Sequence, residues 1–229
     1  DEVVRREFRL VEGDAFNTST LRRAQKRIYN LGFFQKAEVA NAPGSAPDKT
    51  VVNVKVSERS TGEISFGAGF SSTAGVLGDI GIRERNLLGR GQDLSLKLKL
   101  SAASSDIDLK FTEPYFMDRR LRAGVDFFRT SRDMSSESSF ERASFGGGLR
   151  LSYEISDKVS QSWNYEISQD EVTDIDLGAS LAIKEQEGTS VKSLIGQALF
   201  YDALDSRVDP SEGFLARYNI DLAGLGGDV

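Results

Sequence analysis

Apolar and polar residues alternate with a period of two through most of this chain, from Glu63 to its end. In residues 94–100, for example, every second residue is leucine, and serine or lysine stands between the leucines. Because successive side chains of a β-strand point to opposite faces of a sheet, this pattern predicts strands with one apolar and one polar face. Further clear examples are residues 64–70, 107–111, 149–155, 163–167 and 214–222. We expect about nine such strands, beginning with residues 63–71 and 76–85.

A soluble β-sandwich and a transmembrane β-barrel both fit this alternation, and sandwiches are the more common. The predicted connections are short at residues 86–91, 115–119, 156–158 and 206–213, and mostly longer and polar elsewhere, as at 130–140 and 170–190. Short turns at one rim and long loops at the other are typical of an outer-membrane barrel, and sandwich strands are usually shorter than those expected here. We therefore predict part of an antiparallel barrel, with Leu98 facing lipid and Lys99 facing the lumen.

Residues 1–31 have a helical period instead. Asp1 is suited to cap a first helix. The apolar face of that helix is expected to contain Val4, Phe8 and Val11. A second helix should begin after Asn17 or Ser19 and end at Gly32, because glycine suits the left-handed position that follows a helix. The residues it should bury are Leu21, Ala24, Ile28 and Leu31.

Two strands are expected after these helices, at residues 34–41 and 50–57. A two-stranded sheet is marginal alone, so we also expect a further strand upstream of Asp1. The sequence thus predicts a small α+β domain over residues 1–62 and a β-domain over residues 63–229. The two regions differ in charge as well, with 11 − 8 = +3 in the first and 18 − 27 = −9 in the second.

The chain contains no histidine and no cysteine. This excludes thiol nucleophiles, zinc sites built from these residues and histidine-based catalytic triads. The net charge of −6 argues against a nucleic-acid partner, because binding nucleic acid requires basic residues that neutralise phosphates. We therefore predict no catalytic residues, no metal ligands and no cofactor.

Two groups of acidic residues could in principle act as catalytic groups or as metal ligands. Asp106 and Asp108 lie two residues apart on a predicted strand, and a second group has the oxygen ligands that calcium prefers. The second group consists of Asp170, Glu171, Asp174 and Asp176. We expect solvated carboxylates in both cases, because the loops and lumen of a barrel normally contact water.

The second predicted helix carries a basic face made of Arg22, Arg23, Lys26 and Arg27. Two interpretations remain open for it. The face is either an ordinary solvated helix surface, or a docking surface for a periplasmic partner or for anionic lipid headgroups.

Five short motifs resemble the Omp85 family of outer-membrane proteins. Residues 56–70 (VSERSTGEISFGAGF) resemble the junction between the last periplasmic POTRA module and the first barrel strand. The other motifs are residues 30–34 (NLGFF), which resemble the end of the second POTRA helix, and three that resemble short turns, 84–92 (ERNLLGRGQ), 111–116 (FTEPYF) and 201–205 with 209–213 (YDALD and DPSEG). The motifs follow the family's order and cover essentially the whole chain.

The resemblance implies a POTRA module over residues 1–62 and the first part of a transmembrane barrel over residues 63–229. It implies a factor that folds and inserts outer-membrane proteins, located in the outer membrane with its POTRA module in the periplasm. The implied partners are the lipid bilayer, unfolded outer-membrane protein clients and periplasmic lipoproteins such as BamD. A two-partner-secretion or other Omp85-type transporter is the alternative, and a barrel fused to a hydrolase is a third interpretation.

In this family the barrel closes where its first and last strands meet, so the resemblance makes the first strand the edge on which client strands pair. A strand entering a bilayer must exchange its backbone hydrogen bonds for those of an existing edge, because no water is available there. Gly67 and Gly69 are expected to weaken this seam. The predicted client edge consists of Ile64, Ser65, Phe66, Gly67, Ala68, Gly69 and Phe70.

Overall fold

The computed structural model describes residues 2–8, 13–72, 74–135, 140–204 and 211–228. The chain divides into two compact units. The first unit comprises Asp1–Gly62 and Glu84–Gln92, and the second comprises Glu63–Arg83 and Asp93–Val229. The segment Glu84–Gln92 thus clusters with the first unit, although it lies within the sequence range assigned to the barrel. In the described ranges, no helix is both long enough and apolar enough to cross a bilayer.

The first unit begins with a single helical turn, α1 (Glu2–Arg5). The prediction of a longer helix with Phe8 on its face is wrong, and Val11 lies outside the described residues. The carbonyl oxygen of Glu7 accepts two hydrogen bonds from the Arg27 guanidinium, at 3.0 and 2.7 Å. Arg27 thus supplies hydrogen-bond donors to the backbone two residues beyond the end of this helix.

Helix α2 (Thr18–Asn30) forms as predicted. The side chain of Asn17 caps it by accepting a hydrogen bond from the amide of Ser19 at 2.9 Å. Gly32 follows the helix with a φ of +73°, the left-handed conformation that glycine adopts without steric cost. The buried residues of α2 are Leu21, Ala24 and Ile28. Leu31 is half-buried.

Strands β1 (Phe34–Pro43) and β2 (Thr50–Glu58) pair antiparallel, with Val39 opposite Val54. Both strands extend slightly further than predicted, and β1 ends at Pro43, which has no amide to continue a ladder. Helix α2 packs on β1, and Gln25 Nε2 donates to the Ala37 carbonyl at 2.9 Å. The core of this unit consists of Val3, Ile28, Phe33, Phe34 and Ala37.

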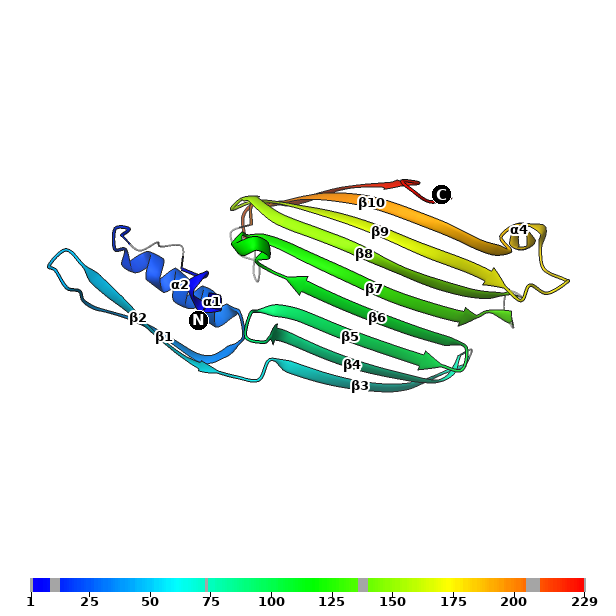
Figure 1. Ribbon diagram of the computed structural model, residues 1–229, viewed down its shortest axis with the longest axis horizontal. Coiled ribbons are helices and arrows are strands. Elements are labelled where there is room, and N and C mark those ends of the chain that lie inside the picture. The colour runs from blue at the N-terminus through cyan, green and yellow to red at the C-terminus, as the bar shows by residue number, and fades with distance from the viewer. Residues whose placement is uncertain (1, 9–12, 73, 136–139, 205–210, 229) are drawn as a thin grey trace. The chain divides into compact units, whose positions relative to one another are not determined.

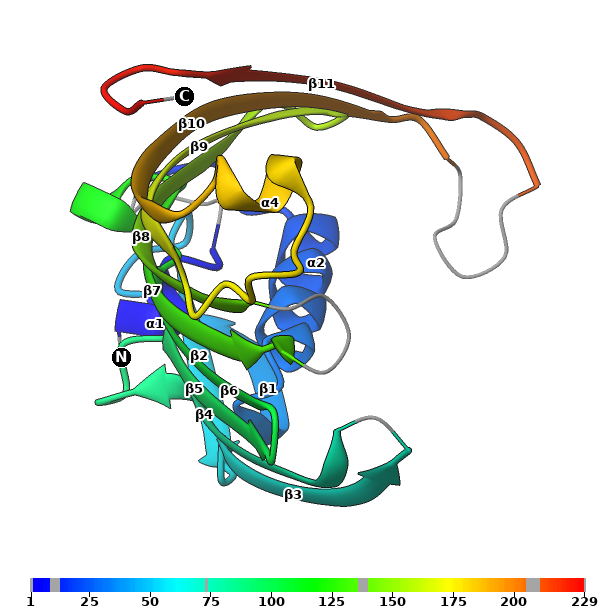
Figure 2. The ribbon, with the colours of Figure 1, turned by 90° about the vertical axis from the view of Figure 1, so that its right-hand side faces the viewer.

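The second unit is one sheet of nine strands within the described residues, hydrogen-bonded in chain order from β3 to β11 (Figure 1). The strands are β3 (Gly62–Ser71), β4 (Gly75–Leu87), β5 (Gln92–Ser101), β6 (Ser104–Glu113), β7 (Leu121–Asp133), β8 (Glu141–Ser156), β9 (Val159–Thr173), β10 (Gly188–Asp202) and β11 (Leu215–Ala223). Figure 2 shows that this sheet is strongly curved. The predicted mainly β fold with antiparallel strands is confirmed.

The strand register separates the side chains onto two faces. Leu96 lies opposite Leu109, and Lys97 lies opposite Asp108. Because directly opposed residues share a face, the apolar and polar residues of β5 and β6 occupy opposite sides of the sheet, as predicted. The apolar face is uncovered, since residues such as Phe145 and Leu149 are 63% and 57% exposed. Their contact with lipid stays a prediction.

The polar face is the concave one. Arg150 on β8 reaches Thr112 on β6, two strands away, and its Nη2 donates to Thr112 Oγ1 at 3.1 Å. Side chains of strands that are not neighbours approach one another in this way on the inside of a curved sheet. A β-carbon added at Gly146 of β8 would lie 2.6 Å from the ring of Phe128, so this glycine makes room for the aromatic side chain.

The connections at the two ends of the sheet contrast less than predicted. Strand β7 continues to Asp133, because residues 130–133 pair with residues 141–144 of β8, so the expectation of loop structure is wrong for residues 130–133. At the same end, residues 102–103 alone join β5 to β6, whereas a long segment with α4 (Leu181–Lys184) joins β9 to β10. The other end has the turn with η1 (Phe116–Asp118). Polar residues that look like loop sequence here extend paired strands.

Candidate functional site

All seven residues of the predicted client edge lie on β3, at one end of the strand order. Among the strands that the structure describes, β3 is hydrogen-bonded to β4 alone. Its apolar side chains are highly exposed, with 66% for Ile64 and 78% for both Phe66 and Phe70. Strands β3 and β11, the two ends of the described strand order, each combine a backbone edge that faces no other described strand with exposed apolar side chains, and both properties favour the addition of a strand.

Two close contacts determine how β3 lies against β4. A β-carbon added at Gly67 would overlap the carboxylate of Asp79, and one added at Gly81 would lie 2.5 Å from Ser65 Oγ. Each of these glycines makes room for a polar side chain of the neighbouring strand. Gly69 differs, because its added β-carbon would lie 3.8 Å from the Leu77 side chain, an ordinary contact.

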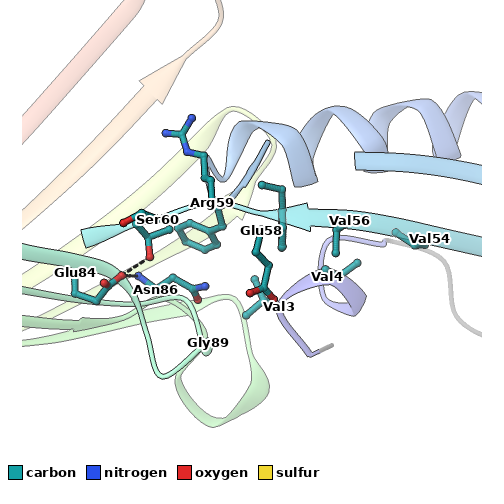
Figure 3. A pocket seen from close by; sticks show the side chains of 13 residues that line it. Val3, Val4, Val54, Val56, Glu58, Arg59, Ser60, Glu84, Asn86 and Gly89 are labelled. Atoms are coloured by element: carbon teal, nitrogen blue, oxygen red, sulfur yellow. Dashed lines mark hydrogen bonds between the residues drawn. The ribbon is translucent and has the colours of Figure 1, made fainter. Parts of the chain in front are cut away.

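The first unit contains an open cavity of about 420 Å³ (Figure 3). Val3 and Val4 of α1 and Val54 and Val56 of β2 form much of its apolar wall. Its polar wall includes Glu58, Ser60, Thr61, Glu84 and Asn86. Strand β2 pairs with β1 alone among the described strands. A further strand upstream of Asp1 stays a prediction.

Glu84 links two parts of the first unit that are distant in sequence. Its carboxylate accepts hydrogen bonds from Thr61 Oγ1 and from the amide of Asn86, the latter at 2.8 Å (Figure 3). These bonds stabilise the charged form and hold the pKa of Glu84 below its usual range. The side chain of Asn86 accepts in turn from the amide of Gly91 at 2.7 Å, which closes the turn. Sequence reasoning missed the role of Glu84, because Thr61 lies 23 residues away.

The basic face of α2 divides into two parts. Arg22, Arg23 and Lys26 are exposed. Arg27 turns inward, where it binds the Glu7 carbonyl and lies 3.8 Å from the Glu7 carboxylate. Arg27 therefore holds the unit together, and the other three residues form the accessible part of the predicted docking surface.

Asp170 lies on the polar face of the sheet, where β9 continues to Thr173. The expectation of a solvated loop carboxylate is wrong for this residue, which is 7% exposed. Arg142 Nη2 and Lys192 Nζ donate to its Oδ2 at 2.6 and 2.5 Å, and Ser144 Oγ donates to its Oδ1 at 2.7 Å. These partners come from β8 and β10, so no local pattern reveals them.

A second network on the same face joins Arg150 to Asp126 of β7, with bonds of 2.5 and 2.8 Å. A β-carbon at Gly124 would lie 2.7 Å from Arg150 Nη2, so this glycine gives the guanidinium its place. No group of three or more carboxylates within the described ranges is arranged to hold a metal ion. What the second unit offers is an edge strand for backbone pairing on a sheet braced by ion pairs.

Comparison with known proteins adds the family. Residues 86–229 match the model of the Omp85 superfamily domain, and residues 1–59 match that of the surface antigen variable number repeat, the POTRA family. The whole chain is similar to outer membrane protein assembly factors BamA, with 29% identity to the one from Neorickettsia risticii and 31% to the one from Nitratidesulfovibrio vulgaris. The chain spans 31% and 29% of the length of these two relatives.

Among solved structures, the chain is similar to the crystal structure of BamA from Haemophilus ducreyi lacking POTRA domains 1–3. The TM-score is 0.77 and the identity 24%, over all of this chain and 46% of that one. This likeness confirms the predicted fold, a POTRA module followed by part of an antiparallel barrel. Since the match to the Omp85 model covers more than half of its residues, the chain belongs to the Omp85 superfamily.

Proposed function

We propose that this chain is part of an outer-membrane assembly factor that folds and inserts β-barrel proteins. Its end-to-end relatives are named outer membrane protein assembly factors, which favours this function over an Omp85-type transporter. In this proposal residues 63–229 form the first part of a barrel in the outer membrane, and residues 1–62 form a POTRA module in the periplasm.

The observation that carries the proposal is the edge of β3. A bilayer supplies no water to an unpaired backbone, so a client strand needs an existing edge for its hydrogen bonds. The backbone edge of β3 that faces away from β4 is paired with no other described strand. A client strand that pairs there places its apolar side chains beside Ile64, Phe66 and Phe70, because opposed residues share a face.

The chemistry of this function is an exchange of backbone hydrogen bonds, with no nucleophile and no acid or base. Its partners are the lipid bilayer, unfolded outer-membrane proteins and a periplasmic lipoprotein such as BamD. For the lipoprotein, we propose contact with Arg22, Arg23 and Lys26, whose side chains are exposed. Replacing these three residues with glutamate should reduce co-purification of the lipoprotein, whereas Lys55→Glu, an exposed change on β2, should not.

Site-directed crosslinking tests the client edge. Single cysteines at Ser65 or Gly69 of the full-length protein, freed of any other cysteine, should crosslink to a cysteine in the terminal strand of a client stalled during assembly. The preferred client position should shift by four residues between these two sites, since both lie on one face of β3 and paired strands advance residue by residue. A cysteine at Gly67 serves less well, because its side chain would meet Asp79.

Leu77 on β4 supplies the matched control. Its side chain lies 3.8 Å from a β-carbon added at Gly69, so Leu77→Cys and Gly69→Cys place their thiols on the same face of the sheet. Strand β4 lies between β3 and β5, so it should give no client crosslink. Equal crosslinking on both strands, or client insertion at the normal rate without any crosslink on β3, would exclude this edge as the template.

A further inference from the structure

The turn between β6 and β7 places two exposed apolar side chains beside two exposed arginines. Phe116 and Met117 are 39% and 75% exposed. Arg119 and Arg120 are exposed as well, and within the described part of the chain neither guanidinium forms an ion pair.

The backbone of this turn adopts a conformation that methionine rarely takes. Met117 and Asp118 have φ values of +56° and +57°, and the Arg119 amide donates to the Phe116 carbonyl at 3.3 Å across them. Aspartate visits this left-handed region readily, whereas a long apolar side chain is disfavoured in it. A glycine at position 117 would close the same turn without that cost. A strained methionine that is also exposed indicates that its side chain is used.

The turn lies where the apolar face of the sheet ends. Phe111 on β6 and Val125 on β7 form an apolar pair close to it. Seen along the sheet in Figure 2, the turn (green) projects from the convex side. Because the polar contact of Arg150 with Thr112 marks the concave face, the apolar residues of the strands face the convex side. The exposed Phe116 and Met117 therefore continue the apolar face toward its rim.

We propose that Phe116, Met117, Arg119 and Arg120 bind the headgroup region of the bilayer leaflet at this rim. The two apolar side chains lie among the upper parts of the acyl chains, and the arginines bind anionic phosphate oxygens. Apolar and cationic side chains together are the usual anchors at a membrane interface. The inference rests on the proposed function, because it requires the convex face to lie in lipid. Continuity with that face favours a lipid surface over a protein as the occupant.

Depth-dependent fluorescence quenching tests this anchor. The full-length protein carries an environment-sensitive fluorophore on Met117→Cys and is reconstituted in vesicles of phosphatidylcholine with or without phosphatidylglycerol. Lipids spin-labelled near the headgroup should quench the fluorophore, and more strongly with phosphatidylglycerol. Arg119→Gln and Arg120→Gln should each lower the preference for phosphatidylglycerol by about fivefold. Arg122→Gln should not, because Arg122 lies opposite Ser152 on the polar face.

A second fluorophore at Phe127, read with lipids spin-labelled along the acyl chain, separates the anchor from the proposed function, since Phe127 is 53% exposed on the apolar face midway along β7. Quenching at position 127 without quenching at 117 would overturn the anchor alone, and quenching at neither would overturn both. The anchor would also be overturned if quenching at position 117 changed neither with the arginine substitutions nor with phosphatidylglycerol. If the fluorophore at position 117 leaves water only when other outer-membrane proteins are present, the turn binds a protein partner instead.

Discussion

Arg142 of β8 and Lys192 of β10 donate to the same atom, Oδ2 of Asp170 on β9. Strands β8 and β10 are not neighbours in the sheet, so one carboxylate ties three strands together. The tie lies on the polar face, near the end of β9. This arrangement predicts that stability of the sheet depends more on Asp170 than on carboxylates that bind a single exposed cation.

Asp170→Asn should lower the free energy of unfolding by about 1 to 2 kcal/mol, because an amide removes the counter-charge of two cations whose side chains are 44% and 45% exposed. Asp108→Asn is the matched control. Asp108 binds Lys110 at 3.3 Å with its side chain 39% exposed, so its loss should cost below about 1 kcal/mol. Urea titration of the full-length protein refolded in lipid measures both values. Equal losses would contradict the role of the three-strand tie.

Valine should act differently at the two glycines of β3. Gly67→Val should destabilise the protein by about 1 to 3 kcal/mol, because the new side chain competes with Asp79 for space. Gly69→Val has room and should strengthen the seam, which slows client insertion without unfolding the protein. Refolding titrations and client insertion rates measure these effects. Asp79→Ala should rescue Gly67→Val, and absence of rescue would show that the carboxylate is not the obstacle.

The two faces of β5 should respond differently to substitution in the full-length protein. Leu98→Arg should cost roughly 2 to 4 kcal/mol if the side chain lies near the bilayer midplane, because it places a charge in lipid. Lys99→Ala, on the polar face, should cost little. Refolding titrations in vesicles compare the two variants. Equal sensitivity at both positions would mean that the sheet has no lipid side.

The bonds of Glu84 predict an acid-sensitive link in the first unit. Its folded pKa lies below the ordinary 4.5, so the link contributes stability above pH 4.5 and loses it as the pH falls through the lowered value. Limited proteolysis of the segment around Thr61 should therefore accelerate in acid. Glu84→Gln should abolish this pH dependence, and Thr61→Val should shift it to higher pH by removing one donor. An identical acid profile in the wild type and in Glu84→Gln would refute the link.

Features with local causes were predictable from the sequence. Asn17 caps the start of α2, and Gly32 follows its end in a left-handed conformation, so both ends depend on neighbouring residues. The period of two likewise separates the faces of β5 and β6. The failures have distant causes. Arg27 binds the backbone just after the first helix from twenty residues away, and Asp170 is buried by partners on two other strands. A polar stretch gives no sign of whether its partners are water molecules or a neighbouring strand. The client edge and the docking residues of α2 remain predictions.

Two contacts, Ser65 beside Gly81 and Asp79 beside Gly67, together favour one register of β3 against β4. A shift of β3 by one residue relative to β4 would turn all its side chains to the wrong face. A shift by two residues in one direction would place Asp79 opposite Ser65. A shift by two in the other direction would place Gly67 opposite Gly81 and leave a void. These contacts therefore favour a single register of β3 against β4. A client strand that pairs with the free backbone edge of β3 meets amide and carbonyl groups at fixed positions. The position of β3 therefore determines which client residues face lipid.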